Sequence, residues 1–92
     1  MIDFNYEYII QCRANTLTGI TPFNTEKYST PEYQNIIEIG KKCIQKDGLI
    51  HFSLNLQGDQ YFVGLWTAHI IYEHGNPEPA LQAQCIEIIK EY

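Results

Sequence analysis

The chain has 92 residues, of which 45% are hydrophobic and 18% charged, a composition typical of one globular domain spanning residues 1–92. Eleven acidic residues against six Lys and Arg give a formal charge of -5, which disfavours nucleic acid as a partner because its phosphates carry the same sign. No apolar run approaches the roughly 20 residues of a membrane span, and Met1-Ile2-Asp3 lacks the basic start of a signal peptide. We therefore expect a cytoplasmic protein with no membrane partner.

The first predicted helix runs from Asp3, as its N-cap, to about Leu17. It carries two apolar stripes, one of Phe4, Tyr8 and Cys12 and the other of Tyr6, Ile10 and Leu17. Gly19 ends this pattern, and residues 19–29 are predicted to form a loop that can include one helical turn around residues 24–28.

The second predicted helix has the clearest start, because Ser29-Thr30-Pro31-Glu32 combines a hydroxyl cap, a proline in the first turn and a glutamate three positions after Ser29. Asp47-Gly48 supplies its end. One face is apolar and consists of Tyr33, Ile36, Ile37, Gly40, Cys43 and Ile44. Gly40 has no side chain, so either a neighbouring helix packs closely against it or it simply lowers helix stability by about 1 kcal/mol.

Residues Leu49 to Gln57 alternate between apolar and polar, as a half-buried strand does. No second strand candidate exists to pair with such a strand. We therefore favour a short helix or an extended connector whose apolar side packs on the core.

The third predicted helix runs from Gln60 to His74, opens at Gly58-Asp59 and ends at Gly75. Apolar residues surround most of its circumference, which predicts a central position and places Trp66 and Tyr72 inside. The last helix begins near Pro79 and reaches Tyr92 without a stop signal. Its narrow stripe predicts a peripheral helix and consists of Leu81, Cys85, Ile88, Ile89 and Tyr92.

The turn and helix around Trp66 resemble one unit of a HEAT repeat. In that family a turn with Asp or Pro leads into a helix that starts roughly V-R-x-x-A-A, and Val63, Trp66, Thr67 and Ala68 fall near those places. Gly64 stands where the family usually has Arg. The resemblance implies stacked antiparallel helix pairs and a protein-binding habit, and small HEAT-like immunity proteins that neutralise toxins are one known form of it.

Three side chains could form a metal or catalytic site, namely His69, Glu73 and His74. Glu73 lies one helical turn from His69 and could orient its imidazole, as carboxylates do beside a metal. However, His69 and His74 are five positions apart and diverge around the helix, so a third ligand from His51 or Cys85 would be needed. A small metal-dependent or hydrolytic enzyme at this site is the alternative hypothesis.

The three cysteines, Cys12, Cys43 and Cys85, are odd in number, widely spaced and set among apolar neighbours. This pattern favours buried hydrophobic residues in a reducing compartment over a disulfide framework or a nucleophile, which needs a stabilised thiolate.

Aromatic residues with polar tips favour protein interfaces, and Tyr61, Tyr6 and Tyr28 are the tyrosines freest to be exposed. Asp59, Tyr61, His69 and Glu73 form the predicted recognition patch, whose acidic character suits a basic protein. A homodimer is a second interaction hypothesis, because a helical stack without a polar cap leaves an apolar edge. Ile86 lies off the stripe of its helix, so a monomer would expose it and a dimer would cover it.

The sequence therefore predicts an all-α domain of four or five helices, HEAT-like in its C-terminal part. We expect a non-catalytic protein-interaction module without a cofactor or a bound metal, and an immunity-type inhibitor of a basic toxin is its most specific form.

Overall fold

The computed structural model describes residues 3–22, 29–58 and 60–91, and within them no strand forms, so the predicted all-α class is confirmed. The elements are α1 (Phe4–Leu17), α2 (Pro31–Asp47), α3 (Leu49–Phe52), the 3-10 helix η2 (Ser53–Gln57), α4 (Val63–His74) and α5 (Pro79–Glu91). The helical turn expected at 24–28, along with Tyr28, Asp59 and Tyr92, lies outside the described residues.

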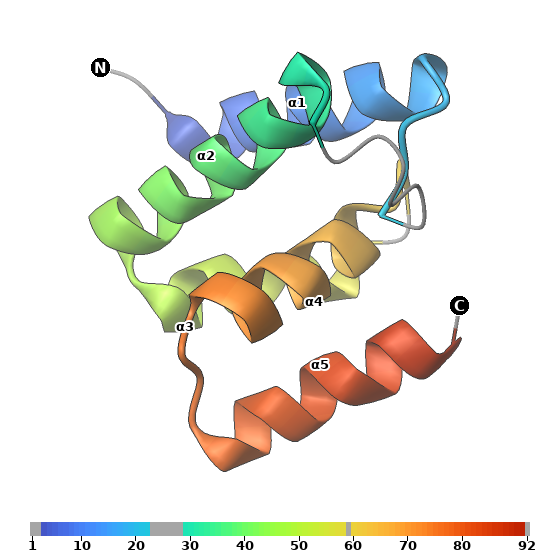
Figure 1. The fold of residues 1–92 in the computed structure, drawn as a ribbon. Helices are drawn as coiled ribbons and strands as arrows, with labels where there is room; N and C mark the ends of the chain where they lie inside the picture. The colour runs from blue at the N-terminus through green and yellow to red at the C-terminus, as the bar shows by residue number, and fades with distance from the viewer. Residues whose placement is uncertain (1–2, 23–28, 59, 92) are drawn as a thin grey trace.

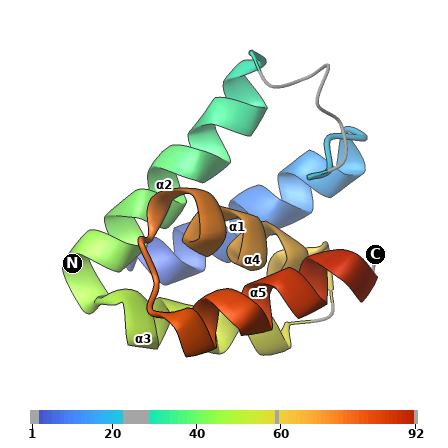
Figure 2. The same ribbon diagram turned by 60° about the horizontal axis from the view of Figure 1, so that its bottom comes forward.

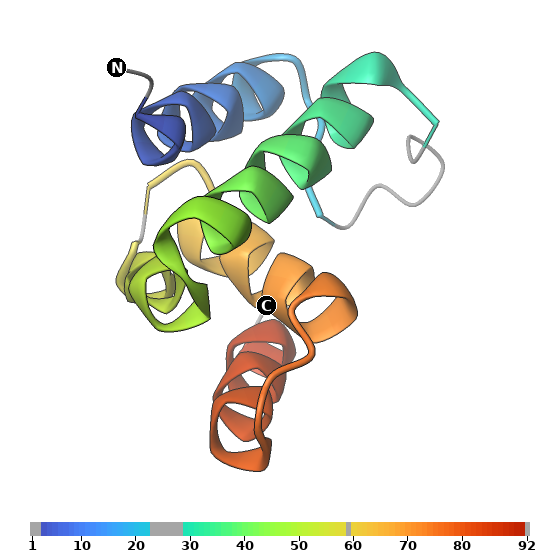
Figure 3. The same cartoon turned by 90° about the vertical axis from the view of Figure 1, so that its left-hand side faces the viewer.

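The helices form two antiparallel pairs, one of α1 with α2 and the other of α4 with α5 (Figures 1 and 2). Helix α4 lies between the α1–α2 pair and α5, as Figures 1 and 3 both show. It contacts α1, α2, η2 and α5. The helix predicted to be central is therefore the one on which most of the domain packs.

Two helix starts follow from local chemistry. The Asp3 carboxylate accepts hydrogen bonds from the backbone N–H groups of Asn5 and Tyr6, so the predicted cap of α1 is confirmed. Helix α2 is capped by Thr30, whose hydroxyl accepts from the Tyr33 N–H at 3.3 Å. The cap is thus the second of the two hydroxyl residues before Pro31, and Pro31 occupies the first turn.

Residues Leu49 to Gln57 form α3 and η2, so the short helix is the correct one of the two favoured conformations. Phe52 and Leu56 are buried, whereas Ile50 and Leu54 are exposed. The two residues of each pair are four positions apart and lie on one face of the helix. Over so short a stretch, a helix with one buried and one exposed apolar pair gives the same alternation of apolar and polar residues as a strand.

The predicted start of the third helix was wrong, because α4 begins at Val63 rather than Gln60. Tyr61 and Phe62 both adopt the left-handed conformation, with φ of 53° and 56°, and thus cannot continue a right-handed helix. Phe62 is the N-cap residue and supplies no side-chain hydrogen bond. The predicted end at Gly75 is confirmed.

Helix α4 is buried over most of its circumference, and its fully buried side chains include Leu65, Trp66, Ile70 and Ile71. The Trp66 indole packs edge-on against the ring of Tyr33 from α2, with 5.0 Å between the ring centroids. Tyr72 was wrongly predicted to be internal and is 44% exposed, because it lies in the narrow sector of α4 that no other helix covers. The prediction of a central helix is otherwise confirmed.

Gly40 lets α4 approach α2 closely, which decides between its two predicted roles. A Cβ atom there would lie 2.8 Å from Cδ1 of Ile70. The glycine is therefore a packing feature of the α2–α4 crossing and not merely a weak point of α2.

A buried hydrogen-bond chain ties α1 to α4. The Thr67 hydroxyl donates to the Val63 carbonyl oxygen at 2.7 Å, so its one hydrogen is used. The Tyr8 hydroxyl, 2.9 Å from Thr67 Oγ1, must then be the donor of that second bond. Burial is also the main reason why the pKa of Tyr8 is raised well above its usual value, so its hydroxyl stays protonated.

This hydrogen-bond chain predicts that substitutions of Tyr8 and of Thr67 have unequal effects on stability. Tyr8→Phe removes a donor and should lower the free energy of unfolding by about 1 kcal/mol, whereas Thr67→Val removes the acceptor of the buried Tyr8 hydroxyl and should cost about 1–3 kcal/mol. Urea denaturation of both variants and of the double variant measures these costs and their coupling. Equal costs for the two single variants would contradict the assigned direction of the bond.

Helix α5 is peripheral, as predicted: Leu81 and Cys85 are buried, and Ile88 and Ile89 are partly buried against the core. Its exposed residues are small or polar, namely Pro79, Ala80, Gln82, Ala83, Gln84, Glu87, Lys90 and Glu91. Ile86 is half-buried within the single chain, so its position does not discriminate a monomer from a dimer. The apolar surface of this domain lies elsewhere.

Candidate protein-interaction surfaces

The residues of the predicted recognition patch lie in two places. Asp59 is outside the described residues. Tyr61 is 37% exposed and lines a groove beside α1 and η2. His69 and Glu73 lie one turn apart on the exposed sector of α4, where His69 is half-buried and Glu73 is exposed. Tyr61 thus belongs with residues that the sequence analysis did not group with it.

The alternative site around His69, Glu73 and His74 has one interacting pair. The Glu73 charge acts on His69, while His51 in α3 is exposed and Cys85 in α5 is fully buried. Among the described residues, no group of three or more His, Cys, Asp or Glu side chains is placed to hold a metal ion.

His69 is a half-buried imidazole with a lowered pKa. Burial disfavours its charged form and lowers the pKa below 6.5, and the nearby Glu73 carboxylate opposes this shift without cancelling it. The imidazole is therefore mostly neutral at pH 7.

A pH-dependent stability follows from this shift. Below about pH 6.5 the unfolded chain binds the His69 proton more readily than the folded chain, so the free energy of unfolding falls as the pH drops. The His69→Gln variant should lack this contribution, so wild type should lose stability relative to the variant between about pH 7.5 and pH 5.5. Urea denaturation of both proteins across that range measures the difference, and a constant difference would contradict the prediction.

The cysteine thiols do not have the properties of nucleophiles. All three are buried and free, as predicted. Burial is the main cause that raises the pKa of Cys12 to about 12 and that of Cys43 to about 11, and it also raises the pKa of Cys85. At neutral pH these thiols are protonated, and they act as small apolar side chains of the core.

Several large hydrophobic side chains are exposed among the described residues. Six of the seven large exposed hydrophobic residues belong to α1 or to the segment between α2 and α4, namely Tyr6, Ile10, Leu17, Ile50, Leu54 and Tyr61. Tyr72 is the seventh. We call the surface around Ile9, Leu54 and Tyr61 the α1–η2 face; Tyr6 lies one helical turn before Ile9 on α1.

The α1–η2 face contains a groove of about 270 Å³, lined by Ile9, Leu54, Asn55, Gly58, Gln60, Tyr61 and Val63. The Asn55 side-chain amide donates to Asn5 Oδ1 at 2.7 Å, which fixes η2 against α1. Tyr61, which lines the groove, and Phe62 next to it both have a left-handed backbone. Such strained backbone costs about 1–3 kcal/mol per residue and is concentrated at functional sites.

The signal for this face was partly present in the sequence. The second stripe of the first helix, Tyr6, Ile10 and Leu17, already indicated apolar residues for which the core had no room. Leu54 was missed because the alternating pattern assigned it to the core side together with Ile50.

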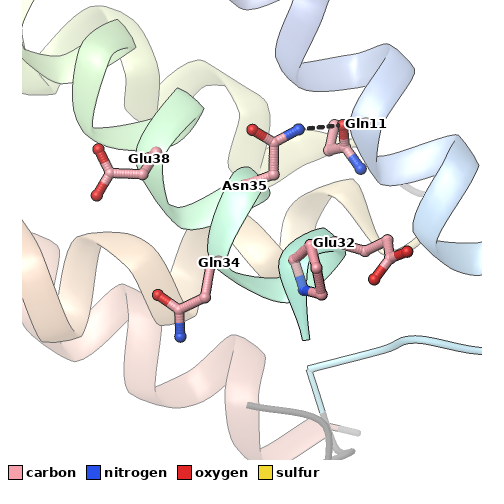
Figure 4. Close-up of a pocket in the computed structure, with 6 residues that line it drawn as sticks. Gln11, Glu32, Gln34, Asn35 and Glu38 are labelled. Carbon is pink, nitrogen blue, oxygen red and sulfur yellow. Dashed lines mark hydrogen bonds between the residues drawn. The ribbon is translucent and has the colours of Figure 1, made fainter. Parts of the chain in front are cut away.

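A second hollow, of about 390 Å³, lies where α1 meets the outer side of α2 and is lined by Gln11, Pro31, Glu32, Gln34, Asn35 and Glu38 (Figure 4). A chain of amide hydrogen bonds joins α1 to α2 beside it. Asn35 donates to Gln11 at 2.8 Å, Gln11 donates to Asn15 Oδ1 at 2.7 Å, and Asn15 donates to the Glu32 carbonyl. We call this the acidic hollow, because both charged side chains that line it are carboxylates.

No family model, curated protein or solved structure matches this chain. None of the helices in the described ranges is long and apolar enough to cross a membrane.

Proposed function

We propose that this chain is a non-catalytic protein-interaction module. The observation that carries the proposal is the α1–η2 face, where Leu54, about two-thirds exposed, and Tyr61, whose backbone is left-handed, line a groove. Contiguous apolar surface of this kind is typical of protein-binding sites. Tyrosine is enriched among interface residues that contribute most to affinity.

The chemistry of the chain favours a basic protein as the partner. The net charge is -5, and the acidic hollow presents Glu32 and Glu38 to solvent. Opposite charges on a partner accelerate association and select against acidic competitors. A cytoplasmic immunity-type inhibitor of a basic toxin is the most specific form of this proposal, supported by the HEAT resemblance.

Affinity capture from the native host, with the tagged wild-type chain and two variants, tests the proposal. Leu54→Lys places a charge on the α1–η2 face, and the Glu32→Gln/Glu38→Gln double variant neutralises the acidic hollow; both sites are exposed, so folding should persist. We expect wild type to retain a basic protein in stoichiometric amount, and each variant to bind it at least tenfold more weakly. Tyr72→Lys, an exposed apolar site on α4, is the matched control and should bind as wild type does.

The proposal fails if no protein is retained in stoichiometric amount, or if the retained protein binds all the variants equally. Release of the partner at high salt would further support the electrostatic part, since screening weakens contacts between exposed charges.

A further inference from the structure

We propose that α5 is a releasable cover of α4. It detaches as one unit about the connection at residues 75–78 while α1 to α4 stay folded, and its release exposes the side of α4 against which it packs. This conformational change involves neither the α1–η2 face nor the acidic hollow, so it is independent of the proposed function.

Helix α5 is attached mainly to one other helix. Figures 1 and 3 both show it beside α4 and away from the α1–α2 pair. Among the described elements, α4 is the only one with which α5 shares an extensive contact, whereas α4 also contacts α1, α2 and η2. Release of α5 therefore breaks one helix contact and leaves the others in place.

Side-chain hydrogen bonds join the other helices but not α5. Tyr8 and Thr67 connect α1 to α4, Asn55 and Asn5 connect η2 to α1, and the amide chain beside the acidic hollow connects α1 to α2. No side chain of Pro79–Glu91 makes a hydrogen bond or an ion pair with another described element. Apolar packing alone holds α5 in place.

This apolar packing is small in extent. Only Leu81 and Cys85 of α5 are buried, whereas α4 has eight buried residues. A helix of 13 residues is marginal in water without tertiary packing. Segments with few buried apolar contacts open locally, at a lower free energy than global unfolding. We therefore expect α5 to open before the rest of the domain does.

The connection between α4 and α5 permits this opening. The Gly75 N–H donates to the Ile71 carbonyl oxygen at 2.9 Å and so belongs to the end of α4. Asn76 and Glu78 are exposed, and Asn76 has a φ of 48°, a conformation that asparagine tolerates better than most residues. The change of direction can thus be confined to residues 76–78, without disturbing α4.

The cysteines provide a direct test, because Cys85 of α5 and Cys12 of α1 are both fully buried. The folded full chain is treated with iodoacetamide, a slow reagent, so that each rate reports the population in which that thiol is exposed. Peptide mass spectrometry at low extents of reaction assigns the rates. We expect Cys85 to react at least tenfold faster than Cys12, which needs global unfolding.

Two variants show whether α5 opens as a separate unit, and circular dichroism checks that each is folded. Ile36→Val weakens the core at a fully buried position of α2, so it should accelerate the Cys12 reaction about fivefold and leave the Cys85 rate unchanged. Leu81→Ala weakens the packing of α5 itself and should accelerate the Cys85 reaction at least tenfold.

Three results would overturn the proposal. Equal rates for Cys85 and Cys12 in wild type would mean that α5 opens only with the whole domain. Equal acceleration of both thiols by Ile36→Val would mean the same. A Cys85 rate that Leu81→Ala does not change would mean that the thiol becomes exposed without the release of α5.

Discussion

Gly64→Ala is expected to destabilise the domain by about 3 kcal/mol or more, a large share of the total for a chain of this size. A Cβ atom at this position would lie 2.6 Å from the Gly58 carbonyl oxygen and 2.9 Å from that of Leu56. Both neighbours are backbone atoms, so neither can turn aside as a flexible side chain can. The Gly64 N–H also donates to the Gly58 oxygen at 3.0 Å, which holds the two segments at this distance.

Gly40→Ala is the matched control, because it too places a methyl group at a helix crossing. Its new Cβ would meet the end of the Ile70 side chain at 2.8 Å, which can move, and alanine adds about 1 kcal/mol of helix propensity. We therefore expect a change within about 1 kcal/mol of wild type. Urea denaturation followed by circular dichroism compares the two variants. A Gly64→Ala protein as stable as Gly40→Ala would contradict the close contact between η2 and α4.

Trp66→Ala is expected to cost about 3–5 kcal/mol, since it empties the largest fully buried side chain of the core. Trp66→Phe should cost less, about 1–2 kcal/mol. Phenylalanine retains an aromatic ring against Tyr33, and it also removes the Nε1–H group, which is buried and has no hydrogen-bond partner among the described residues. An unpaired buried donor is itself unfavourable, so its removal offsets part of the lost packing.

Denaturation of the two Trp66 variants must be followed by circular dichroism, because Trp66 is the only tryptophan of the chain. If the two variants lost the same unfolding free energy, side-chain volume would not determine the loss of stability. A Trp66→Ala protein close to wild type in stability would contradict the burial of this side chain.

The elements that sequence patterns predicted well are those with strong local signals. The starts of α1 and α2 rest on a carboxylate and a hydroxyl cap, and their ends follow from stop residues near Gly19 and at Gly48. The burial of α4 followed from its apolar circumference, which few other arrangements can satisfy.

The remaining features depend on tertiary structure. Tyr61 and Phe62 have no sequence feature that favours a left-handed backbone. They lie in the turn that brings Gly58 into close contact with Gly64 and Val63, which is a tertiary feature. The α1–η2 face could be predicted only in part for the same reason. Ile9 of α1 and Leu54 are 45 residues apart in the sequence, and only the packing of η2 against α1 brings them together.

The acidic hollow shows the same limit. Glu32 and Glu38 are ordinary surface positions of an amphipathic helix when α2 is considered alone. The hollow exists because Gln11 and Asn15 of α1 bind Asn35 and the Glu32 carbonyl across the helix pair. Neither residue of α1 carried a sequence signal for this contact.

The most direct test of the account is native-state hydrogen exchange measured by NMR at single amides, because its central claim is that α4 is enclosed by the rest of the domain. We predict that the amides of Thr67 to Ile71 exchange most slowly and only through global unfolding, while those of the peripheral α5 exchange faster through local opening. Amides of α4 that exchange as fast as those of α5, in the folded protein, would contradict the central position of α4.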